Sequence, residues 1–179
     1  MTTTTYAERQ NDDRQALAAN SNQISKYLTF SLGLEEYGIN IIQIREIIGL
    51  MPVTAIPRTP EHFRGVINLR GKVIPVIDLR RRFGMATEEP TDRTCIVVVE
   101  ISGRHGTPLA MGLVVDSVSE VLNIRTGDIE PAPSLGTELD QRFIAGIAKI
   151  GNKVKILLDI DRVLGEQEFT RAAELAHAA

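Results

Sequence analysis

Short runs of apolar residues, separated by glycine, proline and polar positions, set the pattern along most of the chain. Runs of roughly four to eight residues with this composition and spacing are typical of β-strands. Before residue 86 the pattern predicts strands at residues 27–32, 37–44, 51–56, 66–69 and 73–79. A second strand-rich stretch extends from residue 94 to about residue 164. The sequence therefore predicts an all-β fold.

The segments outside these runs differ in composition. Residues 1–24 are rich in Thr, Asn, Gln and Asp, which predicts a flexible N-terminal tail. Residues 86–92 contain two glutamates and a proline, and they are the best candidate for a linker. Residues 167–179 are rich in Ala and Glu, which favours a short C-terminal helix or a tail. The ordered domain is expected at residues 25–166.

An internal repeat divides this domain in two. Residues 37–48 match residues 111–122 at an offset of 74, and residues 65–79 match residues 146–160 at an offset of 81. Chance similarity between β-rich segments is the alternative, but the Gly and Asp positions fall in register with the apolar pattern. Two copies, each with about five short strands, predict two small barrels packed together. We expect the first at about residues 25–85 and the second at about residues 92–165.

The repeated glycines and aspartates have structural explanations. Gly65 and Gly146 each precede an apolar run, where a glycine marks a tight bend. Asp78 and Asp159 each follow an apolar run, where a carboxylate can cap a helical turn. The turn after Asp78 would carry the arginines of residues 80–82 into solvent.

Composition narrows the class of function. The chain has a net charge of −3, 4% aromatic residues and no tryptophan, which argues against a nucleic acid as the main partner. One cysteine excludes an internal disulfide and fits a reducing compartment. No stretch approaches the roughly 20 apolar residues that cross a bilayer. A cytoplasmic location is therefore expected, with membrane association only through a partner.

The small net charge hides an uneven distribution. Residues 26–85 carry nine basic and five acidic residues, a net charge of +4, whereas residues 91–166 carry eight basic and eleven acidic residues, a net charge of −3. Complementary charge sets the specificity and the encounter rate of protein partners. The two halves are thus expected to present unlike binding surfaces.

Known catalytic and metal-binding motifs are missing. The segment from Gly65 to Val73 has the wrong glycine spacing for a phosphate loop, and it lacks the Ser or Thr that would hold Mg²⁺. The three histidines are far apart, which gives no zinc spacing. Cys95 lies in an apolar run without an activating neighbour, and no nucleophile elbow occurs. We expect no catalytic residue, no metal and no cofactor, and hence a protein that is not an enzyme.

Two features point instead to binding. Arg70 precedes Gly71 in a predicted hairpin turn, where its side chain should project and stay free to pair. Its counterpart in the second copy is Gly151, so the repeated fold does not require an arginine there. Residues 39–48 are apolar on both faces of a predicted strand. One face would fill a core, and the other would pack on the second barrel or form an exposed interaction patch.

Several blocks of sequence resemble one known family. They are residues 36–39 (EYGI), 64–71 (RGVINLRG), 73–79 (VIPVIDL), 112–116 (GLVVD) and 131–133 (PAP). In these blocks the chain is similar to the CheW family of bacterial chemotaxis coupling proteins. The resemblance extends from about residue 25 to residue 166. The resemblance implies two five-stranded Src-homology-3-like barrels and a scaffold without catalytic activity. It also implies two partners, namely the cytoplasmic tip of methyl-accepting chemoreceptors and the regulatory domain of the histidine kinase CheA.

The resemblance further implies two sets of contact residues. Arg70 matches the receptor-binding arginine of the family, and the other matching receptor-binding positions are Ile41, Ile44, Glu46, Ile47, Gly65 and Gly71. The positions that match a kinase contact are Glu130, Pro131 and Leu135. Glu130 departs from the family, because relatives often carry a basic residue there.

Two alternatives stay open at this point. The chain could serve a related chemosensory pathway that does not control flagella. It could also be a double barrel that binds a small ligand.

Overall fold

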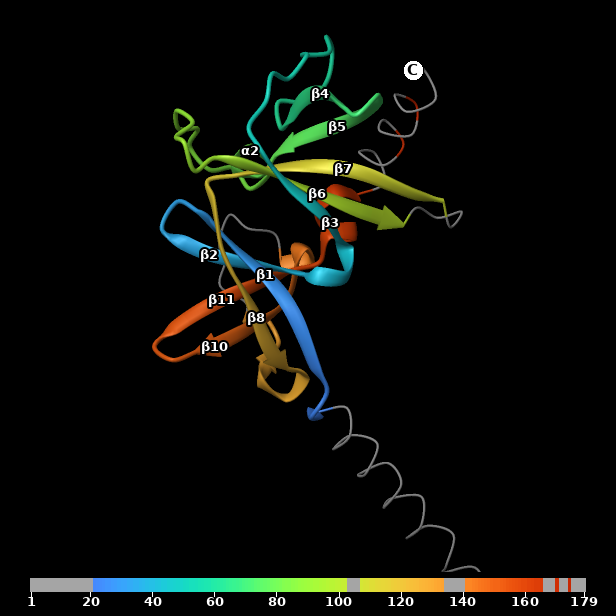
Figure 1. Cartoon of the computed structure of the whole chain (residues 1–179). Coiled ribbons are helices and arrows are strands. Elements are labelled where there is room, and N and C mark those ends of the chain that lie inside the picture. Colours follow the sequence, from blue (N-terminus) through green and yellow to red (C-terminus); the bar gives the residue numbers. More distant parts are fainter. Residues whose placement is uncertain (1–20, 103–106, 134–140, 166–169, 171–173, 175–179) are drawn as a thin grey trace, which may run out of the picture.

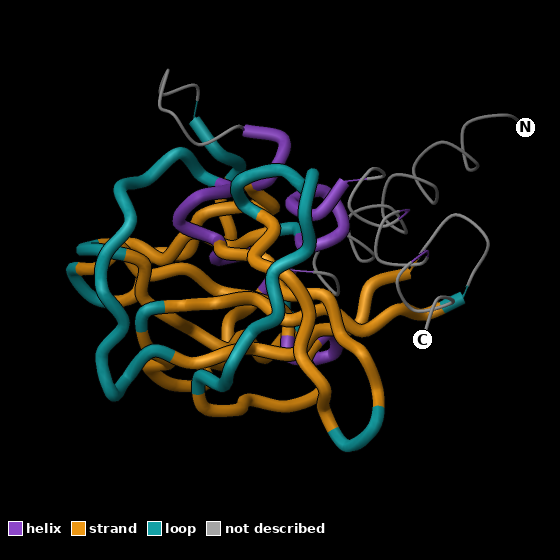
Figure 2. The backbone as a smooth tube through the Cα atoms, turned by 90° about the horizontal axis from the view of Figure 1, so that it is seen from above, coloured by secondary structure: helices purple, strands orange, loops and turns teal. Residues whose placement is uncertain are grey.

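The structure is a computed structural model that describes residues 21–102, 107–133, 141–165, 170 and 174. Within these residues the chain forms two β-sheets that face each other, and the helical segments are short (Figures 1 and 2). The all-β expectation is confirmed. The predicted N-terminal tail lies mostly outside the described residues, and so does most of the predicted C-terminal helix or tail.

Sheet A has six strands and sheet B has five. The strands of sheet A, in spatial order, are β8 (Ser117–Arg125), β1 (Ile24–Leu32), β2 (Glu35–Asn40), β11 (Lys153–Leu158), β10 (Ile144–Ile150) and β9 (Ile129–Glu130). Those of sheet B are β3 (Ile44–Gly49), β6 (Cys95–Ser102), β7 (Pro108–Val115), β5 (Lys72–Asp78) and β4 (Phe63–Leu69). The helical segments are η1 (Ile41–Gln43), α2 (Leu79–Arg82), η2 (Thr126–Asp128), η3 (Gln141–Phe143) and residues 160–165.

The two sheets repeat one wiring diagram. Each contains one parallel pair of strands, β2 with β11 in sheet A and β7 with β5 in sheet B, and the other pairs are antiparallel. In the parallel pairs Gly38 lies opposite Leu157, and its repeat counterpart Gly112 lies opposite Val76. A Cβ atom at either glycine would lie 2.8 Å from a neighbouring apolar side chain, which explains why both copies keep a glycine here.

The predicted barrel boundaries do not match the sheets. Strands β1 and β2 come from the first half of the chain, yet they belong to sheet A with β8–β11. Strands β6 and β7 come from the second half, yet they belong to sheet B with β3–β5. Each barrel therefore contains strands from both halves, and residues 25–85 and 92–165 are not separate barrels. For the same reason, the opposite net charges of the two halves do not divide between the two barrels.

This exchange of strands between the two halves depends on an interruption between β2 and β3, which the apolar sequence pattern did not indicate. Residues 39–48 do not form one strand, because β2 ends at Asn40 in sheet A and β3 begins at Ile44 in sheet B. The intervening segment η1 is a single 3-10 turn, and the Asn40 side chain caps it by accepting a hydrogen bond from the Ile42 backbone N–H at 3.1 Å. In Figure 1 this segment carries the chain from the lower sheet to the upper one.

The repeated glycines Gly65 and Gly146 both lie at register shifts and let another segment approach closely. Gly65 has a φ of 137°, and a Cβ atom there would lie 2.0 Å from the Thr54 carbonyl oxygen. Thr54 pairs with Val66 as an isolated bridge beside β4, where a strand at residues 51–56 was expected. A Cβ atom at Gly146 would lie 2.3 Å from Ile129 of β9. Both glycines have a structural role, as predicted, but they act by allowing close approach at register shifts within β4 and β10 and not by a bend before the strand.

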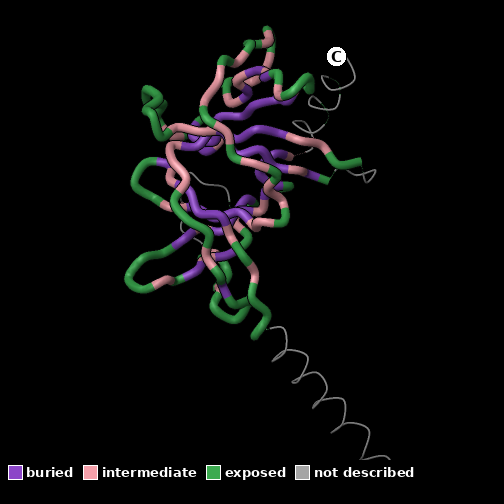
Figure 3. The backbone as a smooth tube through the Cα atoms, viewed as in Figure 1, coloured by how far each residue is buried: buried purple, intermediate pink, exposed green. Residues whose placement is uncertain are grey.

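The main core lies between the two sheets. Buried residues concentrate where the sheets face each other, and the hairpin tips and loops are exposed (Figure 3). A row of aromatic rings crosses this core from sheet A to η3, with centroids 5.8–6.0 Å apart, through Phe30, Tyr37, Phe83 and Phe143. Each barrel also has a smaller core of its own. The shared main core makes the two barrels one packed unit.

The helical turn after β5 is only partly solvated, because Arg81 is exposed as expected but Arg82 is half-buried. Asp78 caps it through a hydrogen bond from the Arg81 backbone N–H, and Asp159 plays the same part after β11. Arg80, however, is buried and donates two hydrogen bonds to the Asp116 carboxylate, at 2.7 and 2.5 Å. Asp116 also accepts from the Gly33 backbone N–H at 2.7 Å. Because Asp116 lies where the chain crosses from β7 to β8, this pair ties sheet A to sheet B.

Candidate partner-binding site

The hairpin between β4 and β5 places Arg70 at the tip of sheet B. Leu69 pairs with Lys72, so the connection consists of Arg70 and Gly71 alone. Both residues have positive φ, 51° and 85°, which is the pattern of a type I′ hairpin turn. The Asn68 side chain supports the turn by accepting a hydrogen bond from the Gly71 backbone N–H at 2.9 Å. The predicted tight turn is confirmed.

An arginine is an unfavourable residue for the first position of this turn. A non-glycine side chain in the left-handed region costs about 1–2 kcal/mol. The equivalent turn of sheet A begins with Gly151, which has a φ of 60° and avoids this cost. A residue that strains the backbone without packing inward suggests a role outside the fold.

The sequence predicted a free Arg70 side chain. In the structure this side chain instead pairs with Glu46 of β3. The Arg70 side chain is 72% exposed and that of Glu46 is 30% exposed. The ion pair therefore leaves most of the guanidinium open to a partner, while Glu46 fixes its position. Exposed ion pairs contribute little to stability, about 0–1 kcal/mol.

We call the barrels formed by sheets A and B barrel A and barrel B. A hollow of about 140 Å³ lies beneath this ion pair, at the mouth of barrel B. Its lining combines the charged rim with apolar side chains of the barrel interior, and it consists of Arg45, Glu46, Leu69, Arg70, Lys72, Ile74, Val98 and Ala110. Small-molecule pockets usually measure about 300–1,000 Å³. The hollow is thus better suited to a side chain of a partner than to a whole ligand.

The two faces of β3 divide the predicted receptor set. A register shift between Ile44 and Glu46 puts Glu46 opposite Val98, on the barrel B side, whereas Ile44 lies opposite Val99 on the side of the main core. Ile47 lies on the same face as Ile44 but is 44% exposed. The structure therefore brings Glu46, Arg70 and Gly71 together and leaves the isoleucines on the other face of an edge strand.

The remaining members of the set have different surroundings. Ile41 is half-buried in η1, and Gly65 lies against the backbone of Thr54, where its effect is on closure of the barrel. Ile42 was not predicted as a contact residue, because the apolar pattern of residues 39–48 indicated one continuous strand. In the 3-10 turn its side chain is 86% exposed. The Asn40 cap is the signal that could have revealed it.

The predicted kinase set lies on the other barrel, at the edge strand β9 of sheet A. Glu130 pairs with Lys149 of β10 at 3.1 Å, and both side chains are more than half exposed. Pro131 is exposed and directly follows β9. Leu135 lies outside the described residues. Glu130 and Pro131 are thus accessible, on a different sheet from Arg70.

Reactive chemistry finds little support in the described part of the chain. Its His, Cys, Asp and Glu side chains form no group of three or more that could hold a metal ion. Burial raises the pKa of the Cys95 thiol, which disfavours the reactive thiolate. Burial also raises the pKa of the Asp161 carboxyl. Among the described residues no helix is long and apolar enough to span a membrane.

Comparisons with known proteins agree with this architecture. The sequence profile of the CheW-like domain matches residues 26–168. The chain is 36% identical to a chemotaxis protein CheW of Klebsiella aerogenes, over 84% of this chain and 88% of the relative. It is 37% identical to a probable chemotaxis protein CheW of Rhizobium etli, over 81% and 90%. The crystal structure of the scaffolding protein TtCheW from Thermoanaerobacter tengcongensis superposes with a TM-score of 0.72 and 39% identity, covering 82% of this chain and 91% of that one.

Proposed function

Because the chain belongs to the CheW-like domain family of chemotaxis scaffold proteins, we propose that it couples chemoreceptors to the histidine kinase CheA. In this proposal it is a non-catalytic adaptor in the cytoplasm, recruited to receptor arrays at the inner face of the membrane. Its membrane contact is through the receptors alone.

The exposed Arg70 is the observation that carries the proposal. The hairpin has no structural need for an arginine, and the residue occupies a strained backbone position. Glu46 holds the guanidinium at the mouth of the hollow in barrel B. A helical receptor tip could place a carboxylate on Arg70 and apolar side chains against the exposed Ile47 and Ile42.

The separation of the two predicted sets supports an adaptor. The receptor set lies on η1 and sheet B, whereas the described members of the kinase set, Glu130 and Pro131, lie at the end of β9 in sheet A. The Arg80–Asp116 pair and the shared main core join the two sheets into one unit. Receptor and kinase could therefore bind at once, and a change at one would bias the position of the other.

Two other functions fit less well. An adaptor of a related, non-flagellar chemosensory pathway would use the same surfaces, and only its cognate partners would distinguish it. A small-ligand double barrel finds no support at the hollow below Arg70, which measures only about 140 Å³. Two larger hollows, of about 290 and 590 Å³, are lined mainly by polar and charged side chains, whereas ligand pockets are lined mainly by apolar ones.

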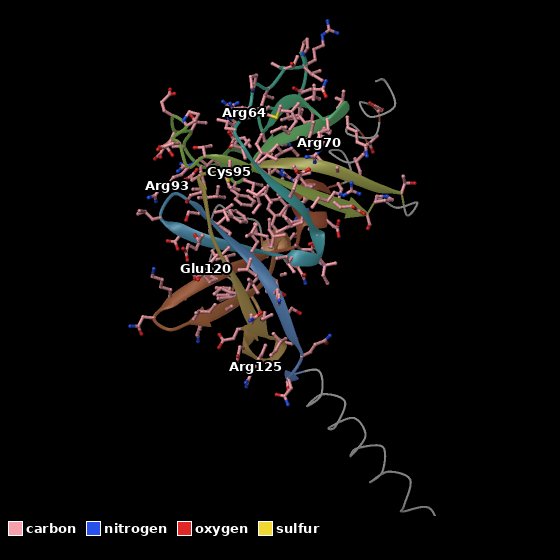
Figure 4. All side chains as sticks on the ribbon, in the orientation of Figure 1. Arg64, Arg70, Arg93, Cys95, Glu120 and Arg125 are labelled. Carbon is pink, nitrogen blue, oxygen red and sulfur yellow. The ribbon has the colours of Figure 1, made fainter. Side chains whose placement is uncertain are left out.

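The test is reconstitution with the cognate kinase and receptor, comparing Arg70→Glu with Arg125→Glu. Arg125 is an exposed arginine at the end of β8, far from Arg70 in the fold (Figure 4), so it controls for charge alone. We expect Arg70→Glu to abolish receptor-dependent kinase activation, with an unchanged circular-dichroism melt. Equal activation by both variants would contradict the proposal.

A charge exchange separates the two roles of Arg70. The double variant Glu46→Arg/Arg70→Glu keeps an ion pair across the rim but reverses its direction. If Arg70 contacts the receptor, this variant stays inactive. If the ion pair only holds β3 in place, activity returns, and Arg70 is not the contact.

A further inference from the structure

The exchange of strands raises the question of what selects the correct pairing. Because the halves are repeats, β2 could pair with β5 of its own half, and β7 with β11, to give two separate barrels. Glu36 of β2 and Lys155 of β11 are 119 residues apart in the chain, whereas Glu36 and Ile74 of β5 are only 38 apart. Closing the shorter loop costs less entropy and is faster. The chain nevertheless adopts the distant pairing in sheet A.

A buried ion pair marks this distant pairing. Lys155 lies directly opposite Glu36 in the parallel register of β11 and β2, and their side chains pair. Lys155 is 4% exposed, and a lysine this deeply buried is rare unless it is paired. The Glu36 carboxylate accepts a hydrogen bond from the Ser119 hydroxyl at 3.2 Å through Oε1, and it faces the ammonium through Oε2.

The other barrel has apolar residues at the same two positions. The repeat offsets relate Lys155 to Ile74 of β5 and Glu36 to Ala110 of β7. In the register of β5 and β7, Ile74 and Ala110 come two residues before the Val76–Gly112 pair. Both belong to the small core of barrel B. Each barrel is therefore internally consistent, with a charged pair in one and an apolar pair in the other.

The local arrangement would break both matches at once. Glu36 would face Ile74, and Lys155 would face Ala110, so the partly buried carboxylate and the buried ammonium would each lose their counter-charge. An unpaired buried charge is far more costly than a buried pair. We propose that the Glu36–Lys155 pair selects the exchanged topology, by penalising the arrangement in which each half folds on itself.

The proposal concerns fidelity of pairing more than stability. The double variant Glu36→Ala/Lys155→Ile gives sheet A the residues of sheet B and leaves no unpaired charge in either topology. After unfolding in urea and refolding of the full chain, we expect a severalfold larger non-native fraction than in the wild type. The fraction is measured as a second set of amide resonances in ¹⁵N-correlated spectra of the monomer isolated by size exclusion.

A charge reversal provides the matched control. Glu36→Lys/Lys155→Glu keeps the pair in the exchanged topology and still buries lone charges in the local one, so its refolding should match the wild type. A single native set of resonances for Glu36→Ala/Lys155→Ile, at wild-type yield, would overturn the proposal. Equal loss of fidelity in the charge reversal would also overturn it, since the defect would then follow any substitution at the site.

Discussion

The two barrels share one strand topology and differ in the position of their ion pairs. In barrel B an ion pair lies at the mouth, Arg70 with Glu46, above an apolar interior. In barrel A the equivalent turn begins with Gly151, and the equivalent acid, Glu120, forms no ion pair with the described residues. Apart from the exposed Glu130–Lys149 pair at its edge, the ion pair of barrel A lies inside, between Glu36 of β2 and Lys155 of β11. Barrel B is therefore equipped at its mouth to bind, whereas the pair in barrel A acts on the fold.

The largest expected difference between the two barrels is in the stability cost of replacing their repeated glycines. Gly65→Ala should lower the free energy of unfolding by about 4 kcal/mol, because positive-φ strain and a clash with a backbone carbonyl each cost roughly 1–3 kcal/mol. Gly146→Ala should cost about 1–2 kcal/mol, since the nearest atom belongs to the Ile129 side chain, which can move. Urea unfolding of both variants measures the difference. Equal losses would show that the two closures are equivalent.

Breaking the buried pair of barrel A should have the next largest effect. Lys155→Ala leaves Glu36 without its counter-charge and should lower the free energy of unfolding by about 2–3 kcal/mol, below the value for a fully buried pair because the Glu36 side chain is 25% exposed. The same urea titration of Glu36→Ala/Lys155→Ile should fall within about 1 kcal/mol of the wild type. A double variant as unstable as the single one would show that packing, not charge, decides.

The link between the barrels should appear in the acid dependence of stability. The hydrogen bonds from Arg80 hold the pKa of the Asp116 carboxyl below its usual value of about 3.8. A lowered folded pKa contributes stability above the unfolded value, and this contribution is lost as the pH falls through the folded pKa. The urea midpoint should therefore begin to fall as the pH drops below about 4 and keep falling towards the folded pKa, and it should fall less in Asp116→Asn. Identical acid slopes would exclude Asp116 as a contributor.

The smallest expected effect concerns the two hairpin turns. Arg70→Gly should leave stability unchanged or raise it by up to about 1 kcal/mol, since it relieves left-handed strain, whereas Gly151→Arg should lower it by about 1 kcal/mol. Thermal melts of the two variants measure both changes in stability. A destabilised Arg70→Gly would mean that the ion pair with Glu46 supports the fold after all.

The sequence predicted most of the strands, the repeat and the structural role of its glycines, because these follow from local periodicity and turn chemistry. The strand expected at residues 51–56 is only an isolated bridge at Thr54. It did not reveal the exchange, because residues 39–48 read as one apolar strand and the Asn40 cap that ends β2 is a weak local signal. It placed the residues 80–82 in solvent, because the partner of Arg80 is Asp116, which is distant in sequence. The prediction of a tight turn at Arg70 was correct. The pairing of Arg70 with Glu46 was not predicted, because it depends on how β3 lies relative to the β4–β5 hairpin, and no local sequence pattern specifies that.

Binding of a soluble chemoreceptor-tip fragment to Arg70→Gly tests the central claim most directly. The claim is that the fold tolerates Arg70 and the partner requires it. Isothermal titration should show affinity at least about tenfold weaker than wild type, a loss of about 1.4 kcal/mol, with a melting temperature no lower than that of the wild type. Wild-type affinity in the glycine variant would contradict the account.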